Sequence, residues 1–121
     1  MRLISFFLTT PQFLDGTKDV TRRLGWKHLK PGDRLMAVRK SQGRKKGEPV
    51  ERLGEIEVKS VYFEPLDAID REDCRREGFP EMGPLDFVQM FCKHMGCEPS
   101  REVTRIEFCK VNNTPSERDT S

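Results

Sequence analysis

The sequence lacks a long hydrophobic run and a large excess of charge of either sign. Its longest apolar stretch near the start, residues 3–8, includes Ser5 and is far shorter than the roughly 20 residues that a transmembrane helix needs. No small-residue cleavage site follows it, so we expect no signal peptide, no membrane contact and a cytoplasmic location. Lysine and arginine number 22 against 20 aspartates and glutamates, and this near balance argues against a chain that its own charge keeps unfolded.

Disulfide and metal motifs are also missing. The four cysteines, at positions 74, 92, 97 and 109, form no C-x-x-C pair, and disulfides need an oxidising compartment that nothing here indicates. Cys92, His94 and Cys97 could be drawn as a metal site, but they fall in a predicted helix, where positions five apart point in different directions. We therefore expect free thiols, no bound metal and no cofactor.

The length of 121 residues corresponds to about one domain, which we expect over residues 1–111, with a frayed tail over 112–121. Hydrophobic and charged residues each make up 35%, which predicts a lean core under a charged surface. Residue patterning predicts strands over 2–8, 34–40, 53–63 and 103–111, an extended segment over 19–23, and helices over 12–15, 66–76 and 84–95. This order favours an α+β fold, with a small β-barrel of about five to six strands and two to three flanking helices.

Two sets of apolar residues are expected to form the core. Ile56, Val58, Ile106 and Phe108 alternate along the two clearest strands, so we expect them inside the barrel. Along the helix over 84–95, the helical spacing predicts that one opening of the barrel is covered by Leu85, Val88 and Phe91.

Positive charge is concentrated in one part of the chain. From Lys18 to Arg52 there are twelve lysines and arginines against four acidic residues, whereas residues 54–102 carry six against twelve. Part of this excess lies in a predicted basic hairpin loop with Arg44, Lys45 and Lys46. Such a concentration predicts a positive face that attracts polyanions such as RNA. The alternative is that these charges pair with the acidic half when the chain folds.

A dense polar cluster, Gly-Thr-Lys-Asp-Val-Thr-Arg-Arg at 16–23, follows the first predicted helix. If residues 19–23 are extended, Thr21 and Arg23 share a face and Lys18 lies at the turn beside them. A hydroxyl, an ammonium and a guanidinium in one small volume suit a phosphate, a carboxylate or a carbonyl oxygen. They also supply a nucleophile and a base, if burial removes the proton of Lys18.

Four short motifs in order resemble the ASCH domain, a branch of the PUA-like superfamily. They are GxKxxTxR at 16–23, Leu-Lys-Pro-Gly-Asp at 29–33, Glu-Gly-Phe at 77–79 and Arg-Ile-Glu-Phe at 105–108. The resemblance covers roughly residues 3–111. It implies a PUA-like β-barrel with a cleft beside the first motif that handles RNA or nucleosides.

One branch of that family, small bacterial amidohydrolases, removes the acetyl group from N4-acetylcytidine. The resemblance places their lysine base on Lys18, their threonine nucleophile on Thr21 and their acidic residue on Glu77, which positions the pair or transfers protons. It also implies that Arg23 holds the substrate or the negative charge that develops on it.

The main interpretation is a domain that binds RNA or a modified nucleoside through a basic face and the polar cleft, and the sequence leaves any protein partner unknown. Its predicted binding residues are Arg22, Arg23, Trp26, Lys30, Arg44, Lys45 and Lys46. The alternative interpretation is an amidohydrolase that deacylates an N4-acylated cytidine-like nucleoside, with Thr21 as nucleophile and Lys18 as base. A third interpretation is a scaffold for a protein partner, which is supported only by the acidic segment 64–102. Each candidate residue also has a purely structural alternative: Thr21 bonded to backbone, Lys18 as a solvated turn residue, Glu77 paired with a neighbouring arginine, and Trp26 in the core.

Overall fold

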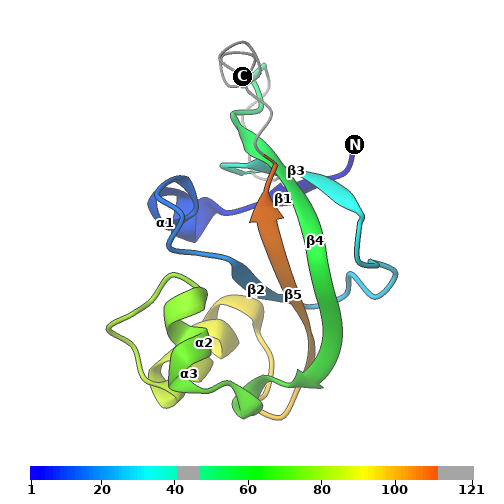
Figure 1. The fold of residues 1–121 in the computed structure, drawn as a ribbon. Coiled ribbons are helices and arrows are strands. Elements are labelled where there is room, and N and C mark those ends of the chain that lie inside the picture. Colours follow the sequence, from blue (N-terminus) through cyan, green and yellow to red (C-terminus); the bar gives the residue numbers. More distant parts are fainter. Residues whose placement is uncertain (41–46, 112–121) are drawn as a thin grey trace.

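The computed structural model describes residues 1–40 and 47–111, so the predicted loop residues Arg44, Lys45 and Lys46 and the predicted tail lie outside the described residues. Its helices are interspersed among the strands along the chain (Figure 1). In chain order they are β1 (Leu3–Ser5), the 3-10 helix η1 (Phe7–Thr9), α1 (Thr10–Leu14), β2 (Val20–Arg23), β3 (Arg34–Val38), β4 (Arg52–Pro65), the 3-10 helix η2 (Leu66–Ala68), α2 (Arg71–Arg76), α3 (Pro84–Met95) and β5 (Glu102–Lys110).

The five strands form one mixed sheet in the order β1-β3-β4-β5-β2, which confirms the α+β class. β1 pairs with β3 in parallel, and the other three pairings are antiparallel. The sheet is not closed, because no backbone pairing among the described strands joins β1 to β2. Instead the Arg23 guanidinium of β2 donates a hydrogen bond to the Ser5 carbonyl of β1 at 2.6 Å. The predicted barrel is therefore corrected to an open sheet whose edges are bridged by one side chain.

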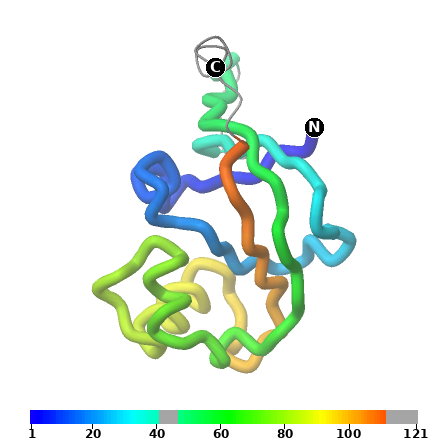
Figure 2. Tube along the Cα trace, viewed as in Figure 1, coloured from blue at the N-terminus to red at the C-terminus, as the bar shows by residue number. Residues whose placement is uncertain are grey.

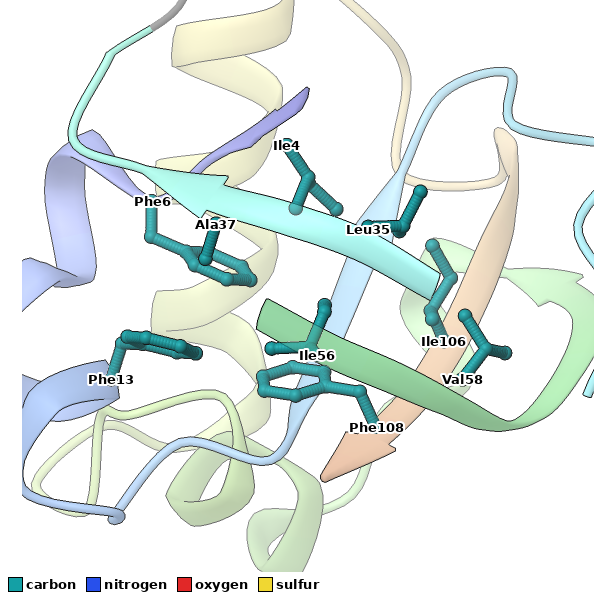
Figure 3. Packing of buried hydrophobic residues seen from close by; sticks show 9 residues of the cluster. All are labelled: Ile4, Phe6, Phe13, Leu35, Ala37, Ile56, Val58, Ile106 and Phe108. Atoms are coloured by element: carbon teal, nitrogen blue, oxygen red, sulfur yellow. The ribbon is translucent and has the colours of Figure 1, made fainter. Parts of the chain in front are cut away.

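The main core lies inside the curve of this sheet (Figure 3). The four side chains predicted to be inside, Ile56, Val58, Ile106 and Phe108, are at most 2% exposed, which confirms that prediction. Phe6 stacks on Phe108, with ring centroids 5.5 Å apart. Phe6 directly follows β1, whose predicted range extended to residue 8; the chain leaves the sheet there to form η1. Each such buried side chain stabilises the fold by about 1.5–3 kcal/mol.

A second core lies between the sheet and the helices α2 and α3, which Figure 2 shows together at one end of the sheet. Phe87, Val88 and Phe91 form the buried stripe of α3, whereas Leu85 is 70% exposed, so its prediction was wrong. At 3.6 residues per turn, Leu85 lies about 160° from Phe87 around the helix, so the two side chains cannot both face the core. None of the described helices has both the length and the apolar character to cross a membrane.

The helix predicted over 66–76 is two shorter elements. Ile69 has an extended backbone, with φ −61° and ψ 139°, and it separates η2 from α2. Asp70 then caps α2, since its carboxylate accepts a hydrogen bond from the backbone N–H of Asp73 at 2.8 Å. Aspartate at such a position favours a helix start over a helix interior, and this restart fixes which side chains of α2 face the sheet.

Candidate functional site

The segment that joins α1 to β2 is held between two helices. The backbone N–H of Lys18 donates to the Gln12 carbonyl of α1 at 3.1 Å, and that of Asp19 donates to the Arg76 carbonyl of α2 at 2.9 Å. These bonds direct the Lys18 side chain inward, where the residue is only 4% exposed. Lys18 is therefore not a solvated turn residue.

Lys18 and Glu77 form a buried pair. The Lys18 ammonium donates to the Glu77 carboxylate Oε1 at 2.9 Å and to the Glu77 backbone carbonyl at 2.7 Å. Glu77 ends α2, and the chain turns away at Gly78 with a φ of +103°, where an added Cβ would lie 3.0 Å from Gln12. Glycine at 78 thus lets α1 and the end of α2 approach closely enough for the pair to form.

Burial lowers the pKa of Lys18, and the neighbouring charges of Arg23 and Arg22 lower it further, while Glu77 opposes the change. Desolvation acts in this direction because a low-dielectric surrounding disfavours the ammonium form. The net effect is a lysine that gives up its proton more readily than an exposed one.

Thr21 and Arg23 lie on one face of β2, as predicted. The Arg23 Nε donates to the Thr21 hydroxyl oxygen at 3.0 Å, and one terminal nitrogen donates to Ser5, so the second terminal nitrogen makes no hydrogen bond within the described chain. Burial lowers the pKa of Arg23 to about 10, against the attraction of Glu77, so the guanidinium stays charged at neutral pH. No hydrogen bond joins Lys18 to Thr21 in the described residues.

These polar side chains share a cavity of about 240 Å³. Its polar part is formed by Lys18, Thr21, Arg22, Arg23 and Glu77. The remaining walls are mainly apolar and aromatic, with large contributions from Phe79, Phe87 and Phe91. The volume is below the roughly 300–1,000 Å³ of pockets that hold drug-sized molecules, so the cavity suits a ligand of one or two rings.

Two of the predicted binding residues lie elsewhere. Trp26 is half-buried against the main core and its ring is covered by the Arg2 guanidinium, 3.7 Å from the ring centroid. Lys30 is exposed at the turn before β3. Neither residue lines the cavity, so the structure separates them from Lys18, Thr21, Arg22, Arg23 and Glu77.

Comparison with known proteins gives the architecture. No family model matches this sequence, and no curated protein matches it significantly. The ASCH domain from Lactobacillus crispatus JV V101 superposes with a TM-score of 0.56 at 17% identity, covering 88% of this chain and 72% of that domain. This chain has the ASCH fold. Protein EF3133 from Enterococcus faecalis V583, of the DUF984 family, gives a TM-score of 0.64 at 12% identity over 89% of this chain and 72% of its own. The hypothetical protein PH0355 superposes with a TM-score of 0.62 at 17% identity, covering 91% of this chain and 96% of its own.

At these identities the likeness shows the ASCH fold alone, and the chemistry must come from the residues of this chain. Sequence analysis missed a layer of charge beneath the polar part of the cavity. Asp73 binds both Arg22 and Arg105, and Glu64 also binds Arg22. We call the six residues that these contacts link the buried ion-pair network: Lys18, Arg22, Glu64, Asp73, Glu77 and Arg105. The spacing of four between Asp73 and Glu77, which puts both on one helix face, is the signal that could have found it.

The positive stretch of this ASCH-fold chain is largely neutralised. Nine of its twelve basic residues are described, and six of them pair with carboxylates: Lys18, Arg22, Lys27, Arg34, Arg39 and Lys40. Lys18, Arg22, Lys27 and Arg34 pair with carboxylates of residues 54–102, whereas Arg39 and Lys40 pair with Glu51 and Glu48 inside the stretch itself. In the described part of the chain, ion pairing therefore interrupts a continuous basic face. No group of three histidine, cysteine, aspartate or glutamate side chains in that part could hold a metal ion.

Proposed function

We propose that this chain binds one nucleobase or nucleoside in the cavity. The observation that carries the proposal is the convergence of Lys18, Thr21, Arg23 and Glu77, from two distant parts of the sequence, on a cavity whose other walls are mainly aromatic and apolar. A planar base offers a π-face to such walls and hydrogen-bonding edges to the polar groups. Arg23 supplies free donors, Glu77 an acceptor and Thr21 a hydroxyl that can act as either.

The size and charge of the cavity favour a single nucleoside over a long polyanion. Arg23 is the cation in the cavity without a carboxylate in a described ion pair, so the polar part accommodates one electron-rich oxygen. Single-stranded RNA would need several unpaired cations along its backbone. RNA binding through Arg44, Lys45 and Lys46 is a separate prediction, because these three residues lie outside the described residues.

Titration calorimetry with cytidine and N4-acetylcytidine tests this proposal. We expect binding by the wild type, and a loss of about tenfold or more in Arg23→Gln, because a hydrogen bond to a charged group contributes about 1.5–3 kcal/mol. Lys30→Gln is the matched control, since this exposed cation lies away from the cavity. Phe79→Ala tests the aromatic wall of the cavity independently of Arg23. This second variant is needed because Arg23→Gln also removes the hydrogen bond that bridges β1 and β2. Absence of heat with either ligand at millimolar concentration, in a folded wild type, would contradict the proposal.

A second candidate function is hydrolysis of an N-acylated nucleobase. The specific observation in its favour is that a buried amine, a hydroxyl and a carboxylate, those of Lys18, Thr21 and Glu77, line the same cavity. The Thr21 oxygen would bond to the amide carbon while its proton passes to neutral Lys18. The C–N bond would then break as that proton moves to the leaving amine. Water would hydrolyse the resulting ester and restore the hydroxyl.

This reaction needs Lys18 to leave Glu77 and approach Thr21, a contact that ligand binding would have to create. The test is release of acetate from N4-acetylcytidine. Thr21→Val removes the hydroxyl with little change of shape, and we expect a loss of about a hundredfold or more, whereas Thr21→Ser retains activity. Equal rates for wild type and Thr21→Val would leave the cavity as a binding site only.

A further inference from the structure

We infer that Arg22 and Asp73 are positioning residues, which together hold the Glu77 carboxylate beside Lys18 and, through their opposite charges, control the proton affinity of Lys18. The role of this arrangement in the cavity rests on the proposed function, whereas the contacts themselves are independent of it. Neither residue belongs to the set that the sequence motifs assign to catalysis.

The sheet register creates the need for Asp73. β2 and β5 pair so that Arg22 lies directly opposite Arg105, and β4 places Tyr62 on the other side of Arg105. Two arginines side by side in a buried site repel each other unless an anion lies between them. Asp73 supplies that anion: its carboxylate accepts from Arg22 at 2.5 Å and from Arg105 at 2.7 and 3.1 Å.

The helix α2 then links Asp73 to Glu77. The two residues are four apart, so both face β2. The Arg22 guanidinium spans them: its Nη2 donates to Asp73, and its Nη1 donates to the Glu77 Oε2 at 3.3 Å. The other oxygen, Oε1, is thereby left for Lys18 at 2.9 Å. Glu64 of β4 holds the same Arg22 nitrogen at 2.7 Å, so Arg22, with a side chain only 1% exposed, is fixed on three sides.

These contacts give Arg22 and Asp73 opposite influences on Lys18. Arg22 is a like charge near Lys18 and disfavours its ammonium form, whereas Asp73 offsets the charge of Arg22. Among the described residues, the other charged or titratable groups around the Lys18–Glu77 pair are Arg23 of β2, Cys74 of α2 and His94, which lines the cavity from α3. Glu64 of β4 and Arg105 of β5 act on the pair through Arg22 and Asp73. Replacing Arg22 by a neutral residue should raise the pKa of Lys18. Neutralising Asp73 should lower it.

The experiment follows the Lys18 side chain by NMR in protein with isotope-labelled lysine, assigned with Lys18→Arg. We expect Arg22→Gln to raise the pKa of Lys18 and Asp73→Asn to lower it, each by about one unit, because a charge within a few ångströms commonly shifts a pKa by 1–3 units. Arg22→Lys retains the charge and should restore most of the wild-type value. Arg75→Gln is the matched control, because Arg75 is an exposed arginine of α2 that pairs with Glu72 on the outer side.

A purely structural role would not move the two variants in opposite directions. Shifts of the same sign, or no shift in folded variants, would overturn the inference. Glu64→Gln provides an independent arm if Asp73→Asn does not fold, since it removes another anion from Arg22 and should lower the pKa of Lys18 by a smaller amount. The titration needs no ligand, so failure of nucleoside binding would refute the proposed function and leave this result standing. Where hydrolysis is measurable, its pH profile should move in the same two directions.

Discussion

Arginine–carboxylate pairs occur in two settings in this molecule, on the outside of the β3–β4 hairpin and beneath the cavity. On the hairpin, Arg39 meets Glu51 at 2.9 Å with side chains 44% and 58% exposed. In the buried ion-pair network, Arg22 meets Asp73 at 2.5 Å with side chains 1% and 13% exposed. Both are arginine–carboxylate pairs with similar distances, so they differ mainly in how far solvent reaches the two charges.

The comparison teaches which of these pairs carry information about function. An exposed pair is screened by water and salt and contributes about 0–1 kcal/mol. A buried pair costs much desolvation energy, and removing one partner costs about 3–5 kcal/mol because the other charge is left buried without compensation. In this chain the exposed pairs neutralise much of the charge of the positive stretch. The buried pairs hold the polar side chains of the cavity in place.

The largest difference between the two settings should appear on removing one arginine from each. Arg22→Leu leaves Glu64, Asp73 and Glu77 without their shared cation, and we expect a loss of about 3–5 kcal/mol of unfolding free energy. Arg39→Leu should lose about 0–1 kcal/mol. Urea denaturation of both variants measures the contrast. Similar losses in the two variants would show that burial does not separate these pairs.

The comparison also applies to RNA binding, because a carboxylate paired with an arginine offsets the attraction of that arginine for phosphate. We predict that replacing Arg44, Lys45 and Lys46 together by alanine lowers the slope of log affinity against log salt by about two to three units, if each contacts phosphate. Filter binding of a single-stranded RNA over a series of salt concentrations gives the slope. The control, Arg34→Ala with Arg39→Ala, should change it little. Unchanged affinity of the triple variant at low salt would disprove a role for the loop.

Much of the sheet could be predicted from the sequence, as could three of the polar residues in the cavity, Lys18, Thr21 and Arg23. Alternation identified Ile56, Val58, Ile106 and Phe108 as interior because a half-buried strand repeats every two residues. The same period placed Thr21 and Arg23 on one face. Glu77, by contrast, lies 59 residues beyond Lys18, and only resemblance to the ASCH pattern linked them.

What the sequence could not predict depends on register and on where elements end. The contact between Arg22 and Arg105 follows from the pairing of β2 with β5, which no local pattern encodes. β1 stops at Ser5 although the apolar run continues to Leu8, and the sheet stays open between β1 and β2. Leu85 was assigned to the core on hydrophobicity, but the buried face of α3 is set by Phe87 and Phe91.

The smallest effect concerns acid. Burial raises the pKa of Asp73, but hydrogen bonds from Arg105 and Arg22 outweigh it and lower the pKa to about 2. A carboxyl with a depressed folded-state pKa stabilises the fold above its ordinary value of 3.8, and this stability is lost as the pH falls toward 2. We expect a contribution on the order of 1–2 kcal/mol, since one pKa unit corresponds to about 1.4 kcal/mol and Asp73 is in partial contact with solvent.

Urea denaturation of the wild type at pH 5, 4, 3 and 2.5 measures this contribution, with Asp73→Asn as the comparison because asparagine does not titrate. The wild type should lose unfolding free energy more steeply than Asp73→Asn below pH 4, while above pH 5 their difference should stay constant. Glu51→Gln, from the exposed pair with Arg39, serves as the control and should follow the wild type closely, because removing a screened pair changes little. Parallel curves for wild type and Asp73→Asn would mean that the two arginines do not hold the Asp73 carboxylate ionised, and the contrast between buried and exposed pairs would then fail for its central member.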